Sequence, residues 1–138
     1  MEVIILSRAR ARKYSYCPHN LKSALISIND IDQDFLNFNN NEDNNIRGVL
    51  KLRFDDVTDG PGVINNIQAK QIATFVNYWS DKVDRIVVHC SAGVSRSAGC
   101  AAAILKYLTG DDTQVFNNYM YRPNMTVYRH VLNALVGC

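Results

Sequence analysis

Residues 87–97 read VVHCSAGVSRS and join two kinds of local pattern. The apolar run Ile86–Val88 is typical of a buried strand, and the pattern that begins near Ser97 is typical of a helix. Between them lies a loop of small residues, with a cysteine (Cys90) at one end and an arginine (Arg96) at the other. A strand, a tight loop and a helix in this order predict a loop that wraps an anion.

The composition of this loop suits a phosphate group. Backbone N–H groups of small residues can turn inward and form an anion-binding nest, because no large side chain crowds them. The N-terminus of the next helix adds its positive dipole end, and the planar guanidinium of Arg96 matches two phosphate oxygens. We therefore predict that phosphate, or sulfate in its place, is bound by the loop residues Ser91, Ala92, Gly93, Val94, Ser95 and Arg96.

The same positive field acts on the thiol of Cys90. Helix N-termini and nearby cations lower a cysteine pKa from about 8.5 to about 3.5–7.5, so Cys90 is expected to be a thiolate at neutral pH. A thiolate inside a phosphate-sized loop can attack phosphorus and form a phosphocysteine. Ser97 is expected to hydrogen-bond the sulfur and ease its departure. His89 is interpreted as a buried orienting residue and not as a base.

Three acidic residues after an earlier strand are candidates for the proton donor. Asp55, Asp56 and Asp59 follow a strand that ends at Phe54. The leaving oxygen needs a proton, and a positioned acid accelerates such a step by about 10²–10⁴-fold. We favour Asp56, because strand alternation carried past Phe54 places it on the buried side. Asp59 is the alternative, and the remaining acids would cap the turn or the next helix.

Length and composition limit the other possibilities. The 138 residues predict one domain, residues 1–138, and a hydrophobic fraction of 47% is enough for a core. The net charge of +2 gives no reason to expect nucleic acid or membrane as a partner. No apolar run approaches the roughly 18 residues of a membrane span, and no signal peptide is recognisable. We expect a monomer in the cytoplasm, where a reducing environment suits a reactive cysteine.

The order of the elements predicts the fold class. Strands are expected at residues 2–7, 24–28, 49–54 and 85–89, and helices from 65 to about 80, over 97–108, from 111 to about 120 and from 126. Residues 8–20 are interpreted as an irregular, solvated basic segment, and residues 31–47 as mostly loop with a helical turn near 32–38. Strands that alternate with helices predict an α/β fold: a single central, mostly parallel sheet of four to five strands with helices on both faces.

The motif over residues 89–97 resembles the HCxxGxSRS signature of the cysteine-dependent protein tyrosine phosphatase superfamily. It is most similar to the compact dual-specificity branch and its bacterial predicted tyrosine phosphatase relatives. Arg122-Pro123-Asn124, which precedes the last predicted helix, is similar to the R…PN segment of the dual-specificity enzymes, and the resemblance covers about residues 48–135. It implies a phosphatase-like fold and hydrolysis of phosphotyrosine, with phosphoserine and phosphothreonine as further substrates, on a phosphorylated protein or peptide.

The resemblance also implies roles for single residues. The acid just past a strand protonates the leaving group first and then acts as base for water. Arg122 would supply a second anion contact beside the loop, although a surface arginine at a helix end explains it equally well. Neither metal nor cofactor is expected, because Arg96 and the backbone donors already neutralise the phosphate charge. The four cysteines also lack the spacing of a zinc site.

Other readings of the chain stay open. A phosphoinositide or RNA 5′-phosphatase is disfavoured, because those relatives carry lysines or a histidine inside the loop. A non-catalytic pseudophosphatase would be expected to lose Cys90, Arg96 or the acid. The sequence gives neither the physiological substrate nor the choice between tyrosine-only and dual specificity. It also leaves open whether Cys17 approaches Cys90 and protects it as a disulfide.

Overall fold

The computed structural model describes residues 1–39 and 42–137 and is built on one parallel sheet. Four strands pair in the order β1-β4-β2-β3. The strands are β1 (Glu2–Leu6), β2 (Ser23–Asn29), β3 (Ile46–Arg53) and β4 (Arg85–His89). The helices are α1 (Arg8–Tyr14), α2 (Asn66–Trp79), α3 (Arg96–Thr109), α4 (Thr113–Phe116) and α5 (Met125–Val136), with a 3-10 turn, η1, at Glu42–Asn44.

The two central strands are β2 and β4, and their sequences explain their position. Every residue of β2 is buried, and so are four of the five residues of β4. A strand covered on both faces reads as a continuous apolar run and not as an alternating one. The segments ALISI in β2 and IVV in β4 have this character, whereas β3 alternates and forms an edge.

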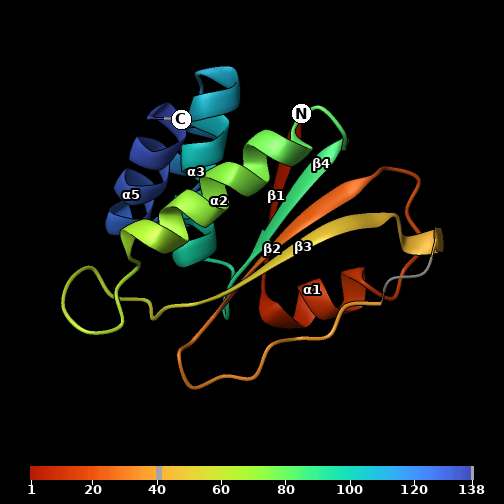
Figure 1. The fold of residues 1–138 in the computed structure, drawn as a ribbon, viewed down its shortest axis with the longest axis horizontal. Coiled ribbons are helices and arrows are strands. Elements are labelled where there is room, and N and C mark those ends of the chain that lie inside the picture. The colour runs from red at the N-terminus through yellow and green to blue at the C-terminus, as the bar shows by residue number, and fades with distance from the viewer. Residues whose placement is uncertain (40–41, 138) are drawn as a thin grey trace.

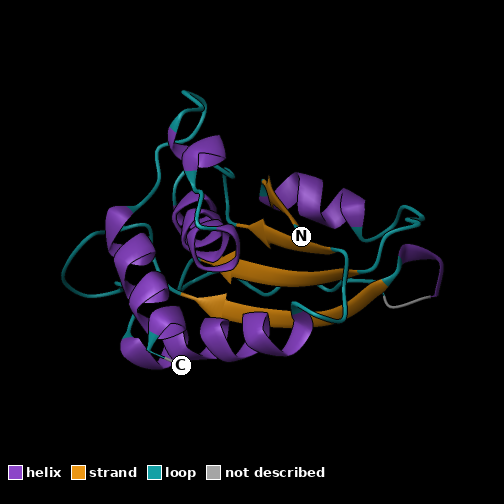
Figure 2. Ribbon diagram, turned by 90° about the horizontal axis from the view of Figure 1, so that it is seen from above, coloured by secondary structure: helices purple, strands orange, loops and turns teal. Residues whose placement is uncertain are grey.

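Helices cover both faces of the sheet, as predicted. Figures 1 and 2 show α1 on one side and α2 on the other. The larger hydrophobic core joins the sheet to α2, α3 and α5, and a smaller cluster lies around Tyr14 of α1. The α/β class with a mostly parallel sheet is therefore confirmed, with four strands.

Helix α3 packs closely because its residues are small. Residues 96–105 are all buried, and five of them are alanine or glycine. A Cβ atom at Gly99 would collide with the carbonyl oxygen of Asn124, just before α5. Small side chains thus let the start of α5 lie directly against the first turns of α3. This brings residues 122–124 next to residues 90–96, the predicted phosphate-binding loop, called the phosphate loop below.

Three sequence-based expectations about local structure were wrong. Residues 8–14 form helix α1 and not an irregular segment: Ser7 caps it by accepting a hydrogen bond from the Arg10 N–H, and Ala11 and Tyr14 are buried. The segment 31–47, predicted to be mostly loop, has no helical turn over 32–38, and β3 already begins within it, at Ile46. Residues 40 and 41 of this segment lie outside the described residues. The helix expected to reach residue 120 ends at Phe116.

Parallel pairing brings the carboxyl ends of all four strands to one edge of the sheet. This is where open α/β sheets bind their ligands. Asp30 follows β2, Phe54 and the acidic residues follow β3, and Cys90 follows β4. Among the described residues, no helix has the length and apolar character needed to cross a membrane.

Candidate active site

The loop between β4 and α3 holds its two functional candidates at opposite ends. Cys90 follows the last residue of β4 and is 2% exposed, and Arg96 is the first residue of α3 and is 4% exposed. The Cys90 sulfur lies 3.0 Å from the Ser97 hydroxyl oxygen. The structure therefore brings Cys90, Arg96 and Ser97 together. Their catalytic roles stay predictions.

The surroundings of the thiol favour its ionised form. Burial by itself raises the pKa of Cys90, but four interactions outweigh it and lower the pKa from the ordinary value. They are hydrogen bonds from the Ser97 side chain, the Ser97 backbone and the Gly93 backbone, and the charge of Arg96. These are the donors expected for a thiolate at a helix N-terminus.

Arg96 is held by three acceptors, which use three of its five N–H donors. Its Nη1 lies 2.7 Å from Asp30 Oδ1 and donates to the Phe54 carbonyl oxygen at 2.8 Å. Its Nη2 donates to Ser91 Oγ at 3.1 Å. Within residues 1–39 and 42–137, its buried Nε has no hydrogen-bond partner. A buried donor without an acceptor is costly, so Nε is free to donate to the anion that this loop is predicted to bind. The other such atom, Nε of Arg85, belongs to the opposite end of β4.

His89 is fully buried behind the loop and makes two hydrogen bonds. Its Nδ1 lies 3.1 Å from the Cys90 carbonyl oxygen and its Nε2 lies 2.6 Å from Ser27 Oγ. A carbonyl only accepts, so Nδ1 carries the proton and Nε2 accepts from the Ser27 hydroxyl. Burial lowers the pKa of His89 to about 4, and the charges of Arg8 and Arg96 act in the same direction. These contacts place a neutral histidine behind the loop, and its orienting role stays a prediction.

This depressed pKa makes stability depend on pH. An unfolded histidine takes up a proton below its ordinary pKa of 6.5, whereas native His89 does so only near pH 4. Stability is therefore expected to fall as the pH drops from 6.5 toward 4, by at most about 3 kcal/mol. Urea unfolding at several pH values measures this slope, and a His89→Asn variant should show a shallower one. Equal slopes in the two proteins would contradict the assignment.

Of the three candidate acids, the structure brings Asp56 to the phosphate loop. Its Oδ1 accepts hydrogen bonds from Ser95 Oγ at 2.8 Å and from Asn124 Nδ2 at 3.0 Å. Asp55 instead accepts from the Ile31 N–H, and the exposed Asp59 accepts from the N–H of its own neighbour Gly60. The expectation that Asp56 is buried was wrong: it is exposed, because β3 ends at Arg53 and the alternation does not continue.

Asn124 joins the acid to the loop, and sequence reasoning missed it as a site residue. Its N–H donates to the Ser95 carbonyl oxygen at 3.0 Å, and its Nδ2 donates to Asp56 Oδ1 and to the Val57 carbonyl oxygen. Its Oδ1 caps α5 by accepting from the N–H groups of Thr126 and Val127. One side chain thus fixes the acid, while the backbone of the same residue supports the loop. Its place before the last helix in the R…PN resemblance was the available signal.

Arg122 lies at the rim of this arrangement. Its N–H donates to the Val94 carbonyl oxygen at 2.9 Å, and its side chain is exposed. It lines a cavity of about 580 Å³ together with Asp56, Asp59 and Ser95. The structure therefore places Arg122 beside the loop, where a second anion contact was predicted, and that role stays a prediction.

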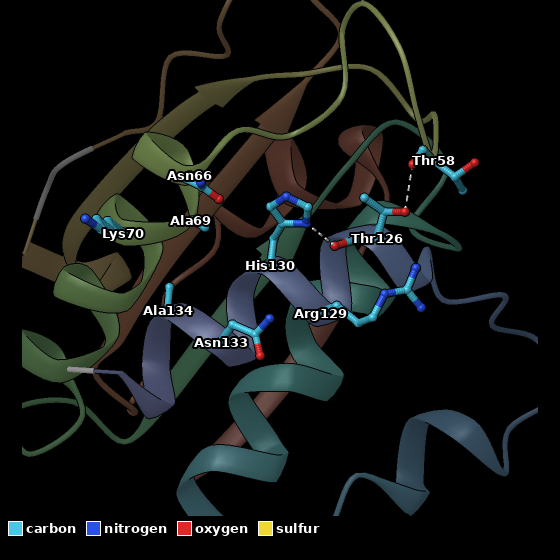
Figure 3. Close-up of a pocket in the computed structure, with 9 residues that line it drawn as sticks. All are labelled: Thr58, Asn66, Ala69, Lys70, Thr126, Arg129, His130, Asn133 and Ala134. Carbon is cyan, nitrogen blue, oxygen red and sulfur yellow. Dashed lines mark hydrogen bonds between the residues drawn. The ribbon is translucent and has the colours of Figure 1, made fainter.

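A second cavity of about 570 Å³ lies between α2 and α5 (Figure 3). It is behind the loop that follows β3 and carries Asp55, Asp56 and Asp59, called the acid loop here. Thr58 reaches it from the acid loop, and its carbonyl oxygen accepts a hydrogen bond from Thr126 Oγ1 at 2.9 Å. Figure 3 shows His130 between the two helices, with Lys70 and Arg129 pointing away from one another. These two cations do not converge on one point. The residues that line this cavity include none from the phosphate loop.

Two other cysteines, Cys17 and Cys100, lie among the described residues. Cys17 is exposed and Cys100 is fully buried, and both are free thiols. Burial, together with the charge of Cys90, raises the pKa of Cys100 to about 12. Among the described residues, no three of the types histidine, cysteine, aspartate and glutamate gather closely enough to hold a metal ion.

Gly93 gives the loop its shape. Its φ of +73° suits glycine, and a Cβ atom there would lie 2.7 Å from the Ser7 nitrogen and 2.9 Å from the Leu6 oxygen. Gly93→Ala is therefore expected to lower stability by about 2–4 kcal/mol, since backbone strain adds to a steric clash. Gly110→Ala is the matched control: its φ is +78°, but it has open space around it, so it should cost about 1 kcal/mol. Urea unfolding measures both, and equal losses would contradict the packing argument.

Comparison with known proteins identifies the fold. No family model matches the chain, and no curated protein matches its sequence. Among solved structures, Tk-PTP in the active form matches with a TM-score of 0.63 and 16% identity, over 98% of this chain and 91% of the other. PTPMT1 in complex with PI(5)P matches with a TM-score of 0.57 and 18% identity, over 99% and 91%. Human tyrosine phosphatase-like serine/threonine/tyrosine-interacting protein matches with a TM-score of 0.57 and 19% identity, over 81% and 75%.

Proposed function

We propose that this chain, whose fold is that of the cysteine-based tyrosine and dual-specificity phosphatases, hydrolyses phosphotyrosine on proteins through a phosphocysteine intermediate. One observation carries the proposal. A buried thiol with a lowered pKa shares a small-residue loop with a buried arginine, Arg96, whose Nε has no described partner. A nucleophile and a vacant anion-binding donor in one loop are what attack on a phosphate ester requires.

The first step would form a bond from the Cys90 sulfur to phosphorus while the bond to the ester oxygen breaks. Nε and Nη2 of Arg96, with the loop N–H groups, would hold the phosphoryl oxygens. The ester oxygen leaves with the electron pair of the broken bond and takes a proton from Asp56. Both described hydrogen bonds of Asp56 go to Oδ1, so Oδ2 is the oxygen left to carry that proton.

The second step would return the enzyme to its starting state. Asp56, now a carboxylate, takes a proton from water, and the water oxygen attacks phosphorus as the sulfur–phosphorus bond breaks. The sulfur leaves as a thiolate, and the Ser97 hydroxyl, 3.0 Å away, is placed to donate a hydrogen bond to the charge that develops on it. Inorganic phosphate is the product.

The charges around the loop support a singly phosphorylated protein as the substrate. The loop side chains between Cys90 and Arg96 carry no charge, and Asp30 already pairs with Arg96. The two nitrogens Nη1 and Nη2 of Arg8 are occupied by Asn29 and by the Asp34 carbonyl oxygen. A phosphoinositide or an RNA 5′ end brings more negative charge, and few cations are left to meet it. Dual specificity, a monomeric state and a cytoplasmic location stay predictions.

Turnover measured on four substrates tests the proposal. p-Nitrophenyl phosphate, with vanadate as inhibitor, asks whether the chain is a phosphatase at all. Paired phosphotyrosine and phosphothreonine peptides of one sequence measure the specificity, and short-chain phosphatidylinositol 5-phosphate tests the alternative substrate. We expect the phosphotyrosine peptide to give the highest kcat/KM. Absence of turnover on all four with vanadate binding retained would favour a non-catalytic phosphate-binding protein, and absence of both would refute the proposal.

A further inference from the structure

Three polar residues at the carboxyl end of β2 each contact a different part of the candidate site. Ser27 Oγ lies 2.6 Å from His89 Nε2, Asn29 Oδ1 accepts from Arg8 Nη1 at 2.7 Å, and Asp30 Oδ1 lies 2.7 Å from Arg96 Nη1. Of the three, Asp30 contacts Arg96, the side chain that is predicted to bind the phosphate. Its contact with Arg96 joins residues that are far apart in the sequence and that no motif connects.

The acceptors around Arg96 leave its guanidinium little freedom. Asp30 and the Phe54 carbonyl oxygen both bind Nη1, and Ser91 Oγ binds Nη2. Since a guanidinium is planar, fixing these two nitrogens also fixes the direction of Nε. The edge formed by Nε and Nη2 is then the one that remains for two phosphate oxygens. Phe54 and Ser91 offer neutral oxygens, and Asp30 supplies the charged one.

Asp30 is itself held in place. Its N–H donates to Gln33 Oε1 at 2.8 Å, and its carbonyl oxygen accepts from the Gln33 N–H at 3.1 Å. The next residue, Ile31, donates its N–H to Asp55 Oδ1 at 3.0 Å. The carboxylate of Asp30 is therefore presented by a hydrogen-bonded turn and is about one-third exposed, whereas the Arg96 side chain is 4% exposed.

We infer that Asp30 is a positioning residue: its carboxylate holds Arg96 so that Nε and Nη2 face the phosphate. The inference rests on the proposed function, because it concerns the arginine that would bind the phosphoryl group. A carboxylate near an anion site should by its charge alone weaken anion binding. Its contact with Nη1 strengthens anion binding, because it orients the guanidinium of Arg96. Removal of Asp30 should therefore strengthen anion binding if the charge dominates and weaken it if the positioning dominates.

Alkylation of Cys90 separates these effects without requiring turnover. Iodoacetate carries a carboxylate that Arg96 attracts, and iodoacetamide is neutral, so the ratio of their rates at the Cys90 peptide reports how well Arg96 presents its charge. Mass spectrometry of that peptide excludes the signal from the exposed Cys17. Asp30→Ala should lower the iodoacetate-to-iodoacetamide ratio and weaken vanadate binding by about 10–100-fold, the equivalent of one hydrogen bond to a charged group.

Two further variants show whether Asp30 acts through Arg96. Asp30→Asn keeps an oxygen that can accept from Nη1, so it should lose less than Asp30→Ala. In an Arg96→Ala background only the charge effect of Asp30 remains, so Asp30→Ala should leave the alkylation ratio unchanged or raise it. Asp32→Asn, an exposed acid in the same loop, is the matched control and should bind vanadate like the parent protein. Thermal unfolding of each variant shows which of them are folded under the assay conditions.

The outcomes are distinct. A higher ratio in folded Asp30→Ala overturns the inference, because Asp30 then acts only through its negative charge. An unchanged ratio also overturns it, because Asp30 then has no effect on anion binding. A further fall in the Arg96→Ala background also overturns it. If Asp30→Ala does not fold, Asp30→Asn decides: an unchanged or higher ratio overturns the inference, and a lower one supports it. A parent protein with no anion preference and no vanadate binding would refute the proposed function instead.

Discussion

Cys90→Ser is expected to abolish turnover, with a loss of more than about 10⁴-fold in kcat, as for removal of a nucleophile that acts as part of a unit. The surrounding donors lower the pKa of the thiol, but they cannot ionise an alcohol near neutral pH. The change replaces one sulfur with oxygen at a residue that is 2% exposed, so the fold should persist. Steady-state hydrolysis of the phosphotyrosine peptide measures the loss.

The controls for this prediction separate the nucleophile from the other thiols. Cys17→Ser removes an exposed thiol outside the site and should retain the turnover of the parent protein. Rapid acid quenching of the parent enzyme should trap a phosphate adduct on the Cys90 peptide, detectable by mass spectrometry, and Cys90→Ser should give no such adduct. Turnover that survives in Cys90→Ser would refute the covalent mechanism.

Asp56→Asn should reduce kcat on a phosphotyrosine peptide by about 10²–10⁴-fold, because the amide cannot supply a proton to the leaving oxygen. KM should change little, since Asp56 is not placed to hold the phosphate. The amide oxygen can still accept from Ser95 and Asn124, so the loop arrangement is expected to remain. Steady-state kinetics on the peptide separate kcat from KM.

The dependence on the leaving group tests the role of Asp56 directly. Tyrosine has a pKa of about 10 and needs a proton as it departs, whereas p-nitrophenolate is a much weaker base and needs one far less. The loss in Asp56→Asn should therefore be larger on the phosphotyrosine peptide than on p-nitrophenyl phosphate. Asp59→Asn is the matched control and should retain nearly full turnover. The reverse pattern, with Asp59→Asn impaired and Asp56→Asn active, would move the assignment to Asp59.

The sequence predicts those parts of the structure that depend on local pattern. The apolar runs of β2 and β4 identify central strands, and the small residues after Cys90 identify the loop between β4 and α3, whose anion binding stays a prediction. Helix α1 was missed because RARARKY carries few apolar residues, and the segment is stabilised by burying Ala11 and Tyr14 against the rest of the chain. Alanine, arginine and lysine favour a helix by propensity, but seven residues are too few for a stable isolated helix, so tertiary packing must stabilise it.

The support around the site could not be predicted in the same way. Asn124 and Asp56 are 68 positions apart, and so are Thr126 and Thr58. Asp30 has an ordinary place at the end of a strand, and only the strand order brings it to Arg96. Long-range contacts of this kind depend on topology, which a single sequence does not encode residue by residue. Polar residues at the carboxyl end of a buried parallel strand remain a useful general signal.

The contact of Gly93 with Leu6 and Ser7 has a consequence for how the protein matures in the cell. Strand β1 leaves the ribosome well before β4, the strand with which it pairs. Until β1 and β4 pair, Gly93 lacks its contact with Leu6 and Ser7. The Arg8 N–H also cannot donate to the Ser91 carbonyl oxygen. The environment that lowers the pKa of Cys90 is thus complete only late in biosynthesis. A chain in which β1 and β4 are still apart is expected to carry a less ionised thiol than the folded protein.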